Sequence, residues 1–165
     1  MSTEDDIARV KRQELELVLP VLDEAVAFEI GSAIRARAVA DGLSLVVDIR
    51  TWDRQLFFSA TPGTSSDNAE WVRRKINSVK RFHRASYRLV LERGETPFSP
   101  QAGADPADYV IAGGGFPLRV PGAGIIGSLT IRACRGGRTM RLPSMRFAII
   151  SGAIALIMLC LRPET

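Results

Sequence analysis

Residues 56–75 read LFFSATPGTSSDNAEWVRRK and join the end of an expected β-strand to the start of an expected α-helix. The Pro-Gly pair at 62–63 marks a tight turn between these two elements. Ser65, Ser66 and Asp67 are all N-cap residue types, and Glu70 follows Asp67 at the three-residue spacing of a capping box. Asp67 and Asn68 are most simply read as helix caps. The stretch therefore predicts a strand, a turn and a capped helix that begins at about Asn68.

The beginning of this helix carries three consecutive cations, Arg73, Arg74 and Lys75, close to Trp71. A helix N-terminus has free N–H groups and a partial positive charge, so nearby cations favour a bound anion. The alternative is a solvated helix face, or ion pairs at a subunit contact. Neighbouring residues do not share a helix face, so we expect one of Arg73 and Arg74 to be structural and the other to face a ligand. We expect Trp71 in the core or at an interface.

The rest of the chain alternates helical and β-rich segments. Gly31 stands inside an otherwise helical pattern, which predicts a close packing contact. Residues 86–91 are ambiguous between helix and strand, and we favour a continuation of the preceding helix or a second short helix. Hairpins beside helices are typical of an α+β domain with an antiparallel sheet. The expected helices are 4–19, 23–40 and 68–82, and the expected strands are 43–49, 55–59, 118–120 and 125–131.

The chain has 165 residues, the size of one domain, and a net charge of +4. Six arginines and one glutamate lie in residues 132–165, so this tail accounts for the positive charge and the body is nearly neutral. This distribution argues against nucleic acid as a partner. Cys134 and Cys160 lack the spacing of a metal site, and the polar N-terminus resembles no targeting signal. We expect a cytoplasmic protein.

Several short motifs together resemble a branch of uncharacterised, UPF-type proteins in the haem-degrading-domain superfamily, the GlcG/HbpS-like proteins. Two of them, PGTSSDNAEWVRRK and GGGFPLRVPGAGIIGSLTI, are specific in combination. The resemblance covers about residues 5–131, and we assign 1–131 to this domain. It implies a profilin-like fold with a five-stranded antiparallel sheet, assembly into homo-oligomers, and haem binding by analogy with other branches. The matching residues include Ile30-Gly31, Asp67-Asn68, Trp71, Arg73-Arg74-Lys75, Tyr109 and the segments 45–50, 113–117 and 124–127.

The tail, residues 132–165, departs from this family. Relatives continue with a Ser-Gly-Leu-Pro turn and an amphipathic helix, whereas this chain reads RACRGGRTMRLPSMRFAIISG. A one-base deletion near codon 132 would explain the change, and the nucleotide sequence tests that hypothesis. Residues 147–161 are uncharged, but a membrane span needs about 20 residues. We therefore rank an out-of-frame tail first, a buried helix second and a membrane span third.

Few residues are candidates for chemistry. His83 is the only histidine, which excludes a multi-histidine metal site, so no metal site and no catalytic residue are predicted. His83 is a candidate axial haem ligand, or a histidine whose charge suits the C-terminal end of a helix. Gly113, Gly114, Gly115 and Phe116 are candidates for the wall of a ligand site, although glycines also allow turns and close backbone approach.

We expect a haem-degrading-domain-like protein that binds haem or another anionic small molecule as a cytoplasmic homo-oligomer. The alternative is an oligomeric scaffold or interaction protein without a cofactor. The expected ligand-binding residues are Arg73, Arg74, Lys75, Gly113, Gly114, Gly115 and Phe116, with His83 as a haem ligand and Asp67 and Asn68 as helix caps.

Overall fold

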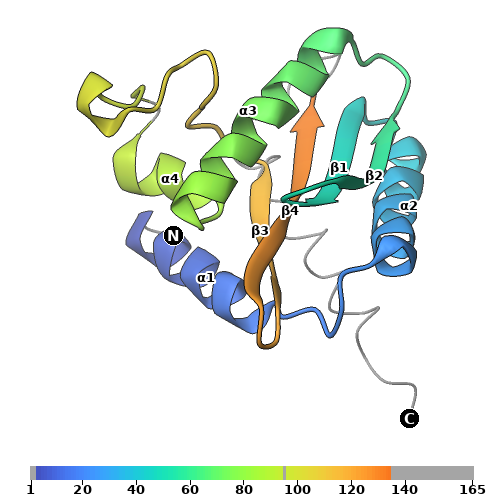
Figure 1. Ribbon diagram of the computed structural model, residues 1–165. Helices are drawn as coiled ribbons and strands as arrows, with labels where there is room; N and C mark the ends of the chain where they lie inside the picture. The colour runs from blue at the N-terminus through green and yellow to red at the C-terminus, as the bar shows by residue number, and fades with distance from the viewer. Residues whose placement is uncertain (1–2, 95, 135–165) are drawn as a thin grey trace.

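The computed structural model describes residues 3–94 and 96–134. The apolar segment 147–161 and the predictions for the tail beyond residue 134 lie outside the described residues. Within these residues, no helix is both long enough and apolar enough to cross a membrane. The elements follow in the order α1 (Thr3–Glu16), α2 (Glu24–Ala40), β1 (Leu45–Thr51), β2 (Gln55–Ala60), α3 (Ser66–Phe82), α4 (Ser86–Arg93), a 3-10 turn (Pro100–Ala102), β3 (Gly115–Val120) and β4 (Gly124–Ala133) (Figure 1).

The described strands form one sheet in the order β2-β1-β4-β3, and every neighbouring pair is antiparallel. The predicted class, α+β with helices packed on an antiparallel sheet, is confirmed. The prediction of five strands is wrong for the described part of the chain, which forms four. The β-rich segments of the sequence indicate four strands, and the fifth was implied by the family resemblance alone.

The two faces of the sheet pack against different helices. Ile49 pairs with Leu129 across β1 and β4, and both belong to a large core that includes Ile30 of α2. Val46 points to the opposite face and joins a smaller apolar cluster with Ile76 of α3. Figure 1 shows α3 lying across the sheet, while α2 lies beside β1 and β2.

Gly31 lies where α2 approaches the sheet. A Cβ atom added at this position would overlap the ring of Phe57 on β2. Phe57 also meets Phe28 edge to face, with ring centroids 6.3 Å apart. The predicted close packing contact at Gly31 is confirmed, because only glycine lets the helix approach the ring so closely.

Capping groups set the helix ends. α2 begins after Asp23, whose carboxylate accepts the Val26 N–H at 2.9 Å. α3 ends at His83, which adopts a left-handed conformation with φ of 50°. The N–H of Ala85 then donates to the carboxylate of Glu14 at 2.6 Å, immediately before α4 begins. Residues 86–91 therefore belong to a second short helix and do not continue α3.

β3 begins at Gly115, three residues before the predicted strand. Pro117 weakens the strand pattern because proline cannot donate a hydrogen bond to a ladder. β3 lies at the edge of the described sheet, and β4 is its neighbour there. An edge position tolerates proline, so β3 can include Pro117. Gly115, the last glycine of the run, is therefore part of the sheet.

Candidate functional site

The N-terminus of α3 is capped by a different pair from the one that the spacing suggests. Ser65 is the N-cap residue, and Oδ1 of Asn68 accepts its N–H at 2.8 Å. The capping box therefore runs from Ser65 to Asn68 instead of from Asp67 to Glu70. Asp67 lies exposed in the first turn, where a negative charge suits the positive end of the helix.

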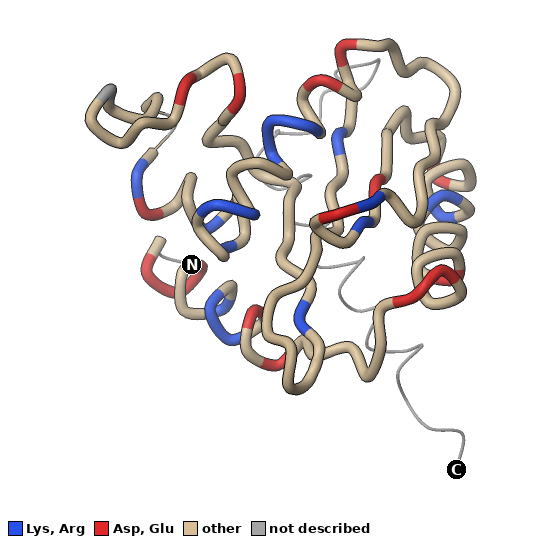
Figure 2. The backbone as a smooth tube through the Cα atoms, viewed as in Figure 1, with Lys and Arg blue, Asp and Glu red and all other residues tan. Residues whose placement is uncertain are grey.

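The consecutive cations of α3 occupy three different environments. Figure 2 shows basic residues along this helix in two groups, at 73–75 and again near its C-terminal end. Arg73 is exposed, Arg74 is half-buried and Lys75 is only 2% exposed. Residues one position apart on a helix point about 100° apart, which separates the three side chains.

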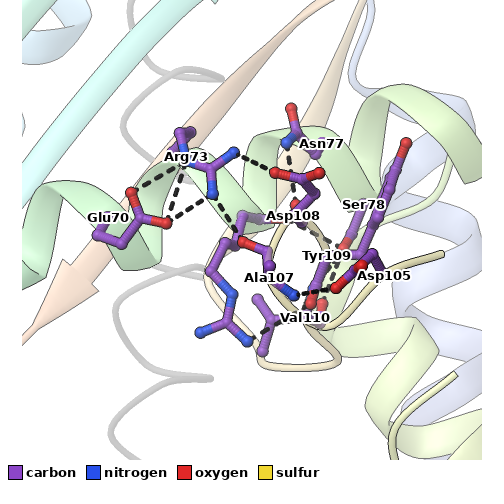
Figure 3. A network of polar contacts seen from close by, with 10 residues as sticks. Glu70, Arg73, Asn77, Ser78, Asp105, Ala107, Asp108, Tyr109 and Val110 are labelled. Carbon is purple, nitrogen blue, oxygen red and sulfur yellow. Dashed lines mark hydrogen bonds and ion pairs between the residues drawn. The ribbon is translucent and has the colours of Figure 1, made fainter.

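Arg73 fastens the loop before β3 onto α3 (Figure 3). Its guanidinium pairs with Glu70 at 2.6 Å and with Asp108 at 2.9 Å, and it donates to the carbonyl of Ala107 at 2.7 Å. The hydrogen bond between Glu70 and Arg73 is the main cause that raises the pKa of Arg73 and lowers the pKa of Glu70. Arg73 is therefore the structural member of the arginine pair.

Ser78 and Arg81 hold the same loop further along the helix. The hydroxyl of Ser78 donates to the carbonyl of Val110 at 2.8 Å and accepts the Val110 N–H at 3.1 Å. Arg81 donates to the carbonyls of Gly103, at 2.9 Å, and Ala102. The loop between α4 and β3 is thus bound to α3 over several turns, as the dashed lines around Ser78 illustrate (Figure 3).

Arg74 lies against an aromatic ring. Its Cζ is 5.0 Å from the centroid of Trp71, and Cζ of Arg132, near the end of β4, lies 4.6 Å from the same centroid. Nη2 of Arg74 reaches the carbonyl of Tyr109 at 3.5 Å, and within the described part of the chain its buried Nε has no hydrogen-bond partner. In the described residues no carboxylate is hydrogen-bonded to Arg74, so its charge is available to an anion.

Lys75 is buried between α3 and the sheet. Its Nζ donates to the carbonyl of Ile131 at 3.0 Å. Gly114 has a φ of 125°, and a Cβ atom added there would lie 2.6 Å from this Nζ and would overlap the Ile131 carbonyl. Only glycine fits at this position. Lys75 thus connects α3, β4 and Gly114 beneath the surface near Arg74.

The other residues of the glycine-rich run also pack closely. The N–H of Gly115 donates to Oγ of Ser86 at 2.8 Å, and Gly113 lies against the ring of Tyr87. Phe116 is 1% exposed and belongs to the large core shared with α2. The run forms an inner wall against α3 and α4, and its contact with a ligand stays a prediction.

His83 lies exposed at the C-terminal end of α3, and its N–H donates to the carbonyl of Val79 at 2.8 Å. It lies nine positions after Arg74, a rise of about 13 Å along a helix. The two candidate contacts for haem therefore lie at different points on α3. Across residues 3–94 and 96–134, no group of three His, Cys, Asp or Glu side chains could hold a metal ion.

The model of the family described as "Haem degrading protein HbpS-like" matches residues 22–137. The chain belongs to the HbpS-like family. A UPF0303 protein of Mesorhizobium japonicum is 56% identical over 133 residues, which cover 79% of this chain and 80% of the relative. A UPF0303 protein of Brucella melitensis is 53% identical over 127 residues, which cover 76% and 75%. The predicted family and its UPF branch are confirmed.

Solved structures share the HbpS-like fold at lower identity. The Ybr137w protein has a TM-score of 0.79 at 18% identity, covering 96% of this chain and 90% of its own. PduOC, solved as a haem complex, has a TM-score of 0.62 at 22% identity, covering 82% and 94%. HbpS has a TM-score of 0.61 at 15% identity, covering 90% and 96%. At these identities the likeness establishes the fold alone.

A buried ion pair on β1 of this HbpS-like chain escapes the sequence analysis. Asp48 is 0% exposed and accepts from Arg50 at 2.7 and 2.6 Å and from Gln55 at 2.5 Å. The hydrogen bond that Arg50 donates to Asp48 is the main cause that raises the pKa of Arg50. Residues two apart on a strand share a face, so the spacing could have suggested the pair. Its burial depends on the packing of the sheet.

The approach of Arg132 to Trp71 also escapes the sequence analysis. The sequence predicts Trp71 in the core or at an interface and counts Arg132 with the divergent tail. The structure makes Arg132 part of β4 and brings it to the ring of Trp71, which is half-buried. No local pattern relates residues so far apart in the chain.

Proposed function

We propose that this HbpS-like chain binds a small anionic molecule at the N-terminal half of α3, and that haem is the first ligand to test. The observation that carries the proposal is the difference between Arg73 and Arg74. Arg73 is paired with Glu70 and Asp108, whereas Arg74 is hydrogen-bonded to no carboxylate in the described residues. A guanidinium in this position suits a carboxylate or phosphate group.

The side chains present fit the anionic groups of haem better than its iron. Arg74 would hold a carboxylate, and Gly113 and Gly115, which pack against α4, would form a wall of the site. His83 is exposed but lies about 13 Å along α3 from Arg74. A bound haem would supply redox chemistry at its iron. The haem-degrading description of the family and the haem complex of PduOC support haem as the first candidate.

We further propose that the protein is a cytoplasmic homo-oligomer. Several large apolar side chains are exposed, which favours burial against a second copy. They include Leu15 at 71%, Phe28 at 64% and Val39 at 50% exposure. The same side chains favour the second candidate function, an oligomeric scaffold without a cofactor. Static light scattering of the full chain measures the subunit number, and a monomer at micromolar concentration would contradict this part of the proposal.

A visible-spectrum titration with haemin tests ligand binding. We expect a saturable, sharpened Soret band for the full chain. Arg74→Gln should weaken binding by about tenfold or more, the order for one charge-assisted hydrogen bond. Arg35→Gln is the matched control, because it removes one exposed positive charge from α2. His83→Ala measures the contribution of iron ligation separately.

A linear, non-saturable response to haemin would remove haem from the proposal. If carboxylate or phosphate compounds then left the unfolding midpoint unchanged, anion binding would fail as well, because a ligand of the native state raises that midpoint with its concentration. The scaffold would then be the remaining function. Equal weakening by Arg74→Gln and Arg35→Gln would indicate general attraction to positive charge without a site on α3.

A further inference from the structure

β2 forms one edge of the sheet, and in the described part of the chain no strand lies beyond it. The N–H of Thr61, just after β2, donates to the carbonyl of Leu45 on β1 at 2.9 Å. Hydrogen-bonded and non-hydrogen-bonded pairs alternate along an antiparallel ladder, so every second residue of β2, counted back from Thr61, bonds to β1. Phe58 and Ala60 are the residues in between, and their N–H and carbonyl groups therefore point away from the sheet.

The opposite edge of the sheet is protected. β3 contains Pro117 and Arg119, and the Arg119 carbonyl accepts the N–H of Leu19 at 2.8 Å, so the chain after α1 covers part of that edge. Prolines, charged residues and covering segments keep sheet edges from pairing with other chains. β2 reads QLFFSA, without a charge or a proline, and its ladder shifts register only near Gln55. The edge at β2 is thus the one that favours a further strand.

α2 and β2 lie together at one side of the molecule (Figure 1), and both carry exposed apolar side chains. Phe58 is 45% exposed on β2, and Phe28 and Val39 are exposed on α2. Phe28 and Val39 are eleven positions apart, so they lie on one side of the helix. This side faces the outer strand, because the ring of Phe28 meets Phe57 of β2 edge to face. We call Phe28, Val39, Phe58 and Ala60 the α2–β2 edge.

The spacing of helix and strand at the α2–β2 edge suits a second copy of the chain. α2 packs on both β1 and β2, which places its axis over the gap between these strands. If β2 pairs with β2 of a second copy, the two α2 helices lie about two strand spacings apart, or about 10 Å. Packed helices are typically about 8–10 Å apart. The strand pair and the helix pair can therefore form together.

The exposed charges of α2 are self-complementary in such an arrangement. Gly31 packs against Phe57, so a two-fold axis through the neighbouring Phe58 passes close to the middle of α2. The two helices then run antiparallel, and the acidic half before Gly31 in one copy lies against the basic half after it in the other. The charged residues are Glu24 and Glu29 in the first half and Arg35 and Arg37 in the second, of which Glu24 and Arg37 also form ion pairs within their own chain. Opposite charges across the axis favour this orientation.

We propose that the α2–β2 edge is the interface with a second copy of this chain. The two β2 strands pair antiparallel about a two-fold axis, and the two described sheets join into one. Phe58 lies opposite Phe58 of the second copy, where the outward N–H and carbonyl groups of the two residues bond to each other and the two rings are neighbours. This inference rests on the homo-oligomer of the proposed function and names the surface that forms it.

Cross-linking tests the register. In the full chain with Cys134→Ser and Cys160→Ser, Phe58→Cys places one thiol beside its own copy at the axis. A short bismaleimide should join these thiols into a covalent dimer at least about tenfold faster than it joins Leu15→Cys, because the interface raises their effective concentration. Leu15→Cys is the matched control, since Leu15 is an exposed apolar residue on α1, outside the α2–β2 edge.

Hydrogen exchange tests the strand pairing with a control inside β2. The amide of Ser59 bonds to β1 within one chain, whereas the amide of Ala60 needs a second strand, and we expect both to exchange slowly in the oligomer. Phe58→Arg brings two like charges together at the axis. It should lower the molar mass measured by light scattering about twofold or more and speed exchange at Ala60 by at least about tenfold. Slow exchange at Ser59 shows that the variant is folded, and Leu15→Arg should change neither measurement.

The outcomes distinguish this inference from the proposed function. Fast exchange at Ala60 in the unchanged oligomer, or equal cross-linking of Phe58→Cys and Leu15→Cys, overturns this interface and leaves the homo-oligomer in place. A monomer by light scattering overturns both the interface and the homo-oligomer. A monomer in which Ala60 still exchanges slowly further identifies a segment of the same chain as the occupant of the edge.

Discussion

The two faces of the sheet are built from different kinds of side chain. The face toward α2 is apolar and so closely packed that Gly31 has no room for a Cβ atom beside Phe57. The face toward α3 includes a smaller apolar cluster and buried polar residues, among them Asp48, Lys75 and Thr130, each at most 2% exposed. Apolar burial stabilises a fold, whereas buried polar groups cost free energy unless they are paired. The α2 face therefore holds the molecule together, and the α3 face is where function is expected.

Matched isoleucine variants should show the largest difference in the free energy of unfolding between the two faces. Ile49→Ala empties a position that is 0% exposed in the large core, and we expect a loss of about 4 kcal/mol in the free energy of unfolding. Ile76→Ala, at 6% exposure in the smaller cluster below α3, should cost about 2 kcal/mol. Urea unfolding followed by circular dichroism measures both. Equal losses would show that the two faces contribute alike.

Removal of the buried carboxylate of Asp48 should have the next largest effect on the free energy of unfolding. Asp48→Ala leaves Arg50 and Gln55 without their acceptor. Loss of one partner from a buried ion pair costs about 3–5 kcal/mol. We expect about 2 kcal/mol here, because the side chain of Arg50 is 30% exposed and water can solvate it. Asp48→Asn keeps the shape and one acceptor and should cost less in the same urea experiment. A neutral Asp48→Ala would contradict a stabilising role for the pair.

Two buried threonines provide a sharper test, with a smaller expected effect on the free energy of unfolding. Thr130 is 0% exposed, and its hydroxyl has no hydrogen-bond partner among the described residues. Thr130→Val should leave stability unchanged or raise it by up to about 1 kcal/mol. Thr61 is its control, since its hydroxyl accepts the Leu45 N–H at 2.8 Å and donates to the Leu43 carbonyl at 2.7 Å. Thr61→Val should cost about 1–3 kcal/mol. A comparable loss in Thr130→Val would mean that its hydroxyl is paired after all.

Local patterns were sufficient for the α2 face. The spacing of apolar residues predicts α2 and the hairpin of β1 and β2, and Gly31 predicts a close packing contact, which the structure makes with Phe57. These features depend on the period of the pattern and on one residue type that breaks it. Asp48 shows the limit of such reasoning, because a charged residue inside a strand is expected to face water. Its burial depends on tertiary packing, which no local pattern shows.

The α3 face depends on contacts that are distant in the sequence. The sequence predicts that Arg73 and Arg74 differ in role, and their helical spacing is the reason. Which of them is structural follows from Asp108 and Ala107, whose loop no local pattern attaches to α3. Arg132 reaches Trp71 only because β4 lies under α3. The sequence thus names this helix and its cations as a candidate site without choosing between Arg73 and Arg74, and ligand binding there stays a prediction.

The smallest expected effect is a shift in the pKa of Glu70. Its titration tests the solvent-exposed ion pair between Glu70 and Arg73. Its hydrogen bond to Arg73 lowers the pKa of Glu70 below the ordinary value of 4.5. A carboxylate with a lowered pKa in the folded state contributes stability above its ordinary pKa and loses that contribution as the pH falls through the folded value. We expect NMR to place the Glu70 midpoint below 4.5, and Arg73→Ala to move it upward. Arg35→Ala on α2 is the control and should leave the midpoint unchanged.

The salt dependence separates this exposed pair from the buried pair on β1. Because Glu70 is solvent-exposed, salt should weaken the shift in its pKa. Salt should barely affect the pair between Asp48 and Arg50. Asn77 of α3 also donates to the carbonyl of Asp108, at 2.9 Å. An unshifted midpoint would mean that the loop is held on α3 by Asn77, Ser78 and Arg81 without the ion pair.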